Sequence, residues 1–166
     1  MANSPEDLAK KELPKGASTL IPRLVCRNPA AAIDFCKTVF LAVEAVRRPG
    51  PDGTVAHALM LIGDAMLMIE AEWPGILNRA PQLDGSSPVV MYLYVVDVDD
   101  TIDKALTAGA RLLAPLTDQF WGDRTASIMD PSGHVWTVAS RIEETTEEER
   151  KSRWSSILEK KNSDNS

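Results

Sequence analysis

The feature that most constrains the fold is an internal repeat with an offset of 69 residues. Asn28 opens the segment NPAAAIDFCKTVF and Asp97 opens DVDDTIDKALTAG, and both residues are of types favoured at helix N-caps. A strand-like run precedes each segment and three such runs follow it, so the order βαβββ occurs twice. One unit of this kind cannot enclose a core alone. The sequence therefore predicts two similar modules, over residues 18–75 and 87–141, joined by a linker over 76–86.

The expected fold class is α+β, with two paired βαβββ modules that form a curled, half-open mixed sheet around a cavity. This domain would span residues 18–142 and follow a flexible, polar arm over 1–17. Acidic residues over 143–149 precede basic ones, which suits a helix dipole and predicts a C-terminal helix and tail over 143–166. Trp154, Ile157 and Leu158 would give this helix an apolar edge, for packing on its own domain or on a partner.

The composition excludes several classes of function. The chain carries 24 acidic and 18 basic residues, a formal charge of −6, and no clustered basic patch of the kind that binds nucleic acid. No apolar run reaches the roughly 20 residues that a membrane span requires. Cys26 and Cys36 fall in a predicted strand and a predicted helix, and we expect reduced core thiols of a cytoplasmic protein rather than a disulfide.

Four further segments, together with the repeat, resemble one superfamily. They are AIDFCKTVF, LIGDAMLMI, QFWGDR and DPSGHVWTVAS. The chain is similar over residues 18–142 to the glyoxalase, bleomycin-resistance and extradiol-dioxygenase superfamily, also called vicinal oxygen chelate (VOC) proteins, and within it to the PhnB-like, glyoxalase-like branch. The resemblance implies a ligand cavity and a homodimer, in which the two-fold or an exchange of modules completes the cavity.

Metal-dependent members of this superfamily place four ligands, His, Gln or Glu, on strand positions that face the cavity. Counted from the helix caps and from the final Asp-Pro turn, these positions correspond here to Ile21, Met68, Val90 and Thr137. None of these side chains supplies the imidazole or carboxylate group that a catalytic divalent metal needs. No cofactor is therefore expected, and a divalent metal bound by neighbouring side chains remains the alternative.

Residues two apart on a strand share a face, so the resemblance also implies which polar side chains enter the cavity. Arg23 and Glu70 would lie there either as a structural ion pair, or with Arg23 binding an anionic ligand group and Glu70 acting as a base or recognising a cationic ligand. Tyr92 would be a core aromatic or a surface on which a ligand stacks. His57 would be a hydrogen-bonded core or barrel-lining residue, or else a proton carrier or ligand contact. Thr137 would offer a hydroxyl where similar enzymes carry a metal ligand.

The FWGDR loop, residues 120–124, is expected at the edge of the cavity. Trp121 and Arg124 are its candidate ligand contacts, and a local ion pair between Asp123 and Arg124 would anchor it. No catalytic residue is assigned. In similar proteins the first helix ends at a glycine, but here Leu41 occupies that place. A left-handed cap at Leu41 would be strained, so a different helix end is expected.

Three classes of function remain. The first is a small molecule of unknown identity bound in the cavity without a catalytic metal, as in drug-sequestering members. The second is a metal-dependent lyase, isomerase or dioxygenase of the same superfamily. The third is a non-catalytic structural or interaction protein whose cavity is filled by its own side chains.

Overall fold

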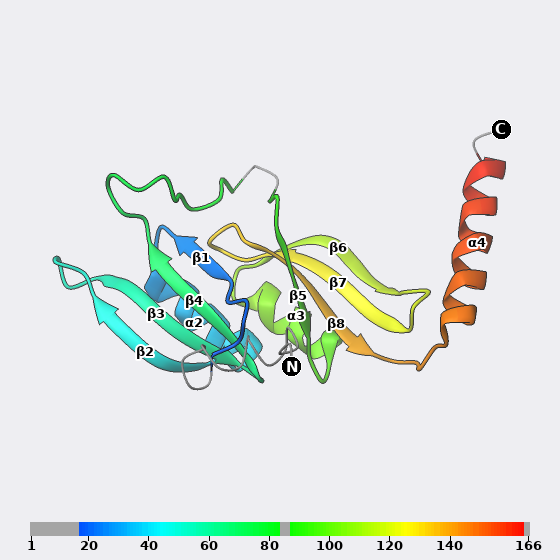
Figure 1. Ribbon diagram of the computed structural model, residues 1–166, viewed down its shortest axis with the longest axis horizontal. Helices are drawn as coiled ribbons and strands as arrows, with labels where there is room; N and C mark the ends of the chain where they lie inside the picture. Colours follow the sequence, from blue (N-terminus) through cyan, green and yellow to red (C-terminus); the bar gives the residue numbers. More distant parts are fainter. Residues whose placement is uncertain (1–16, 84–86, 165–166) are drawn as a thin grey trace, which may run out of the picture. The chain divides into compact units, whose positions relative to one another are not determined.

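The computed structural model describes residues 17–83 and 87–164, which form two compact units (Figure 1). Unit 1 comprises the chain up to Ser87 together with Pro131–His134, and unit 2 comprises Pro88–Asp130 and the chain from Val135 onward. Nearly all of the expected arm over 1–17, and residues 84–86 of the expected linker, lie outside the described residues.

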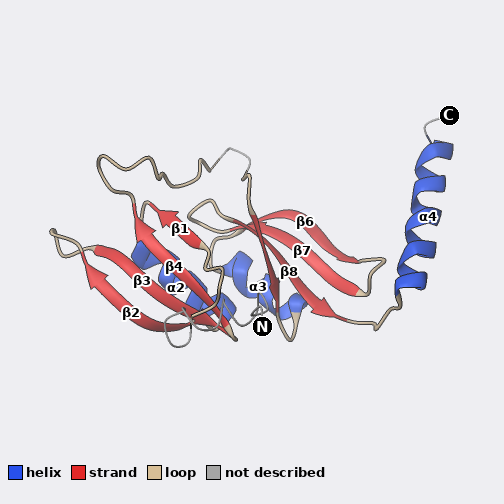
Figure 2. Ribbon diagram, in the orientation of Figure 1, coloured by secondary structure: helices blue, strands red, loops and turns tan. Residues whose placement is uncertain are grey.

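Within its described residues, unit 1 contains one helix and a four-stranded sheet. Its elements are β1 (Arg23–Cys26), α2 (Pro29–Phe40), β2 (Val43–Pro49), β3 (Val55–Ile62) and β4 (Ala65–Ala71). The strand order is β1-β4-β3-β2, with β1 parallel to β4 and the other pairs antiparallel. Helix α2 packs mainly on β3 and β4 and so covers one face of the sheet (Figure 2).

Unit 2 repeats this arrangement and adds a helix. It contains β5 (Val90–Tyr94), α3 (Val98–Thr107), β6 (Arg111–Asp118), β7 (Asp123–Met129), β8 (Val135–Arg141) and α4 (Glu147–Asp164). The strand order is β5-β8-β7-β6, again with its first two strands parallel. The α+β fold with two four-stranded mixed sheets and a C-terminal helix is confirmed.

The offset of the repeat is visible in the strand register. Arg23 lies opposite Met68 in unit 1, and Tyr92 lies opposite Thr137 in unit 2, so both partners move by the same 69 residues. The helix caps repeat as well: the side chain of Asn28 accepts from the Ala31 amide, and that of Asp97 from the Asp100 amide. The two halves are thus built from one local pattern of capping and pairing.

Alternate strand residues divide each sheet into a helix-covered face and an open face, meaning the face away from the helix of the same unit. In unit 1 the helix-covered face carries the fully buried Ala58, Met60 and Ile69. In unit 2 Ile128 and Val138 take that role. Cys26 and Cys36 are buried reduced thiols, as expected. Burial of these apolar side chains on one face leaves the other face to carry polar groups.

Helix α2 does end in a left-handed residue, contrary to the expectation for Leu41. Leu41 has φ 55° and ψ 31°, and it is the one non-glycine residue with positive φ in the described ranges. The next amide, that of Ala42, donates to the carbonyl of Cys36 at 3.1 Å, which closes the helix end. The backbone strain at Leu41 is therefore carried by the surrounding hydrogen bonds and packing.

Replacement of Leu41 by glycine should raise the free energy of unfolding by about 1 kcal/mol, because glycine adopts the left-handed conformation without steric cost. Leu41 is 76% exposed, so little apolar burial is lost. Urea unfolding of Leu41→Gly, with the exposed loop variant Leu77→Gly as a matched control, measures the effect. A Leu41→Gly protein no more stable than the parent would contradict the strain.

Helix α4 begins with a capping box. The Glu149 amide donates to the Thr146 hydroxyl, and the Thr146 amide donates to the Glu149 carboxylate at 2.7 Å. Arg153 forms two hydrogen bonds to the Glu143 carboxylate, which ties the first turns of α4 to the segment after β8. None of the helices in the described ranges combines the length and apolar character needed to cross a bilayer.

Candidate functional site

A row of side chains crosses the open face of unit 1. Pairing places Val25 of β1 opposite Glu70 of β4, Glu70 opposite His57 of β3, and His57 opposite Arg48 of β2. Arg23 lies on the same face of β1, two residues before Val25. The row thus gathers two guanidinium groups, one carboxylate and one imidazole from four strands.

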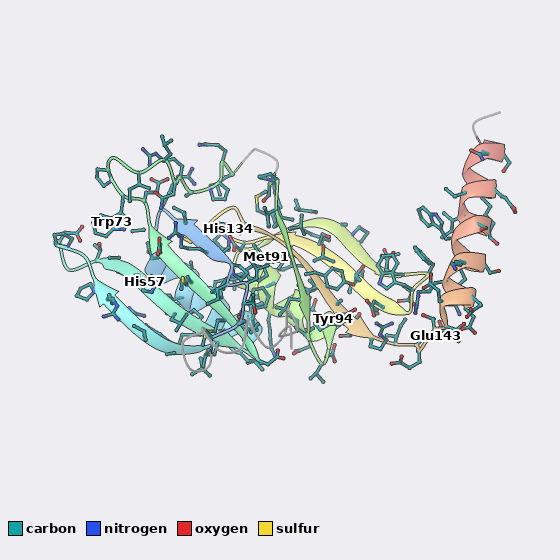
Figure 3. The ribbon with its side chains drawn as sticks, viewed as in Figure 1. His57, Trp73, Met91, Tyr94, His134 and Glu143 are labelled. Carbon is teal, nitrogen blue, oxygen red and sulfur yellow. The ribbon has the colours of Figure 1, made fainter. Side chains whose placement is uncertain are left out.

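Glu70 is the centre of this group. Its Oε2 lies 3.4 Å from Nε of Arg23, and its Oε1 lies 3.3 Å from Nδ1 of His57, which is labelled in Figure 3. The Glu70 side chain is only 16% exposed, whereas that of Arg23 is 53% exposed. A carboxylate between a guanidinium and an imidazole orients both, so this trio can bind an anion or share a proton.

Apolar side chains surround the trio on the same face. Leu59, Leu61, Met66 and Met68 are all half-buried and belong to β3 and β4. Leucine and flexible methionine side chains adapt to ligands of irregular shape. The open face of unit 1 therefore combines a cluster of charged side chains with an adjacent apolar surface, which is usual for a small-molecule site.

Unit 2 carries a different polar centre, built around Asp123 of β7. Three side chains donate to its Oδ2, each at 2.8 Å: the hydroxyls of Tyr92 and Tyr94 and the indole N–H of Trp121. Nε of Arg141 lies 3.1 Å from the other carboxylate oxygen, Oδ1. Asp123 is completely buried. This carboxylate anchors the start of β7, the FWGDR loop and β5 to one another.

These contacts shift the pKa values of the groups involved. Burial raises the pKa of Tyr92 to about 12, and donation to the Asp123 carboxylate adds to the rise. The pKa of Tyr94 is raised chiefly by its own hydrogen bond to the Asp123 carboxylate. Burial alone would raise the pKa of Asp123, but the three donated hydrogen bonds and Arg141 outweigh it and hold the pKa below its usual range. Asp123 therefore stays ionised, and both tyrosines stay neutral.

The structure brings together some of the residues expected from the sequence and separates others. Arg23, His57 and Glu70 meet on unit 1, while Tyr92 and Trp121 meet at Asp123 on unit 2. The hydroxyl of Tyr92 donates to Asp123, and the residue is 48% exposed.

Two expected site residues make their side-chain contacts outside these centres. Thr137 is the register partner of Tyr92, and its hydroxyl lies 3.1 Å from that of Ser127. Arg124 forms ion pairs with Asp99 of α3 and with Asp118, so the local pair expected between Asp123 and Arg124 is wrong. Successive strand residues point to opposite faces, which sends Arg124 toward the helix-covered side.

The donor set does not fit a catalytic metal. His57 and Glu70 are two ligand-type side chains, but the third group beside them is the cationic guanidinium of Arg23. Across residues 17–83 and 87–164, no group of three or more His, Cys, Asp or Glu side chains is placed to hold a metal ion. A divalent cation needs several converging neutral or anionic donors, which this face does not offer.

Comparison with known proteins identifies the family of the chain. The family model of the Glyoxalase/Bleomycin resistance protein/Dioxygenase superfamily matches residues 19–138. The chain belongs to this superfamily. An uncharacterised protein of Mycobacterium bovis is 40% identical to this superfamily member over 133 residues, covering 78% of this chain and 88% of that protein.

Solved structures of the superfamily fold are similar as well. TioX from Micromonospora sp. ML1 is 27% identical with a TM-score of 0.59, covering 74% of this chain and 98% of that chain. The PhnB protein from Bacillus cereus has a TM-score of 0.60 at 15% identity, covering 74% of this chain and 99% of that chain. The second likeness shows the fold alone.

Two residues of these centres were missed by the sequence argument. Asp123 was taken as the partner of Arg124, although strand alternation counted backward from Ser127 along β7 puts Asp123 on the open face. Arg48 was not considered, because the register of β2 contains irregularities that sequence alternation does not reveal. Asp123 binds the predicted site residues Tyr92 and Trp121, and Arg48 lies opposite the predicted site residue His57.

Proposed function

We propose that this superfamily member binds a small organic molecule with an anionic group on the open face of unit 1, without a catalytic metal. The observation that carries the proposal is the charge of that face. Arg23 and Arg48 bring two positive charges, against one negative charge from Glu70, on a chain whose net charge is −6. A positive site on an acidic protein attracts an anion locally.

Arg23 is the group best suited to hold the anion. Its Nε lies 3.4 Å from one oxygen of Glu70 in an ion pair, but a guanidinium has several N–H donors, more than that oxygen can accept. The half-exposed side chain can therefore offer a planar pair of donors to a carboxylate, phosphate or phosphonate. The half-buried leucines and methionines of β3 and β4 then receive an apolar ligand body.

The test is calorimetric titration with benzoate and phenylphosphonate, and with benzamide as a neutral analogue of the same shape, in buffer containing EDTA. Binding of the two anions, and not of benzamide, is expected. Arg23→Met and Arg48→Met should each weaken anion binding by about tenfold, because each removes a charge-assisted contact or a nearby positive charge. Arg47→Met is the matched control.

Arg47 is the neighbour of Arg48 on β2 but pairs with Glu44 on the helix-covered face, so its loss should change anion affinity less than twofold. Equal binding of benzamide, or an equal effect of Arg47→Met, would refute the anion site. Binding that appears only with added divalent metal would favour the metal-dependent lyase, isomerase or dioxygenase. A face that binds none of the three probes, with or without metal, would favour the structural protein.

A further inference from the structure

Helix α4 is attached to unit 2 near its beginning. Arg150 donates to the Thr145 carbonyl, Arg153 donates to the Phe120 carbonyl, and the rings of Phe120 and Trp154 lie 5.2 Å apart. Beyond these contacts the helix rises away from the strands of its unit (Figure 1). Trp154 and Leu158 are 45% and 44% exposed, so the helix presents an apolar edge to solvent.

A hollow of about 640 Å³ lies beside this edge. Its walls come from the FWGDR loop and from the first turns of α4: Phe120, Trp121, Glu147, Arg150, Lys151 and Trp154. The hollow is wide and open along the helix, with aromatic side chains on both walls. A second helix laid against α4 would cover Trp154 and Leu158 and enter this hollow.

The charges of α4 indicate which helix fits. Residues 147–164 contain five acidic and five basic residues, so α4 is neutral while the rest of the chain carries the whole charge of −6. The acids Glu147, Glu148 and Glu149 form the first turn, whereas bases such as Lys160 lie toward the end. Two such helices side by side place acid beside base only when they run antiparallel.

We propose that α4 pairs antiparallel with α4 of a second copy of this chain, with Trp154 near the twofold axis. The pairing buries the apolar edge of both helices against each other. It also joins two acidic chains through their neutral segment, so electrostatic repulsion between the copies is small there. The contact is isologous, so each copy supplies the same residues.

Cross-linking by introduced cysteines tests the geometry of the full-length dimer. Ser155 is exposed beside Trp154, so Ser155→Cys lies near the axis and should form an inter-chain disulfide under mild oxidation. Asn162 is exposed two turns beyond Ser155 on the same side of the helix, and it would lie roughly 20 Å from its counterpart in an antiparallel pair. Asn162→Cys should therefore stay uncross-linked. A parallel pair would link both, and cis docking of α4 would link neither; either result overturns the proposal.

A second experiment replaces Leu158 on the apolar edge of α4 and keeps Trp154, which packs on Phe120. Sedimentation equilibrium of the full chain should show a dimer whose dissociation constant rises at least tenfold in Leu158→Lys. Leu106→Lys makes the same change at a leucine of α3 that is 40% exposed, and it should leave the dimer unchanged. A monomeric parent chain, or a dimer that does not respond to Leu158→Lys, overturns the proposal.

Discussion

Replacement of Asp123 by alanine should lower the free energy of unfolding by about 3 to 4 kcal/mol, the largest effect expected of a single polar residue in this chain. The carboxylate is completely buried and accepts three hydrogen bonds from Tyr92, Tyr94 and Trp121. Its removal leaves those three donors without their acceptor and removes the partner of Arg141. Urea unfolding at pH 7 measures the loss.

The deficit of Asp123→Ala should also depend on pH. The native pKa of Asp123 lies below that of the unfolded chain, about 3.9 for an aspartate, so its contribution is fully present above that value. It is lost as pH falls through the lower native pKa, and the two proteins should converge in acid. Asp103→Ala, at an exposed position of α3, should change stability by less than about 0.5 kcal/mol. A deficit that is small or constant with pH would show that Asp123 is not the anchor.

Replacement of Gly122 by alanine should destabilise the protein by about 3 kcal/mol. Gly122 has φ +93°, and a Cβ there would overlap the carbonyl oxygen of Glu143. The Gly122 carbonyl also accepts from the amides of Ile142 and Glu143, each at 3.0 Å, so the close approach joins the FWGDR loop to the segment that leads to α4. The added methyl group would force these two backbone segments apart.

Gly63→Ala separates the conformational cost from the clash. Gly63 also has positive φ, +59°, but a Cβ there meets nothing within 4 Å. Its substitution should cost about 1 kcal/mol, the strain of a left-handed alanine alone. Thermal and urea unfolding of both variants decide the point, and equal losses at the two positions would mean that the backbone contact at Gly122 adds nothing.

Most of the fold could be predicted because its signals are local and occur twice. Helix caps at Asn28 and Asp97 and alternating strands define each half, and the offset of 69 residues carries the register from one half to the other. The predicted end of α2 was wrong because the prediction considered only the backbone strain of a left-handed Leu41. The hydrogen bond from Ala42 and the burial of α2 against the sheet outweigh that strain.

The candidate site was predicted less completely, for a physical reason. Glu70, Arg23 and His57 lie on regular strands, where alternation alone assigns the face. Arg48 lies next to irregularities in β2, and Asp123 follows a turn, so alternation from earlier residues does not reach either one. Asp123 and Arg124 are neighbours in the sequence but point to opposite faces of the sheet. Arg124 therefore pairs with Asp99 and Asp118 instead of Asp123.

The repeated register also shows how far two copies of one scaffold have diverged. In unit 1 the row that crosses the open face is Val25, Glu70, His57 and Arg48. The same row in unit 2 is Tyr94, Ala139, Thr125 and Thr117, without a single charge. The charged side chains therefore occupy different places in the two halves: in unit 1 they lie in this row, and in unit 2 Asp123 and Arg141 form an ion pair outside it. A substitution in the row of unit 1 would therefore alter the proposed anion site and leave the contacts of Asp123 in unit 2 intact.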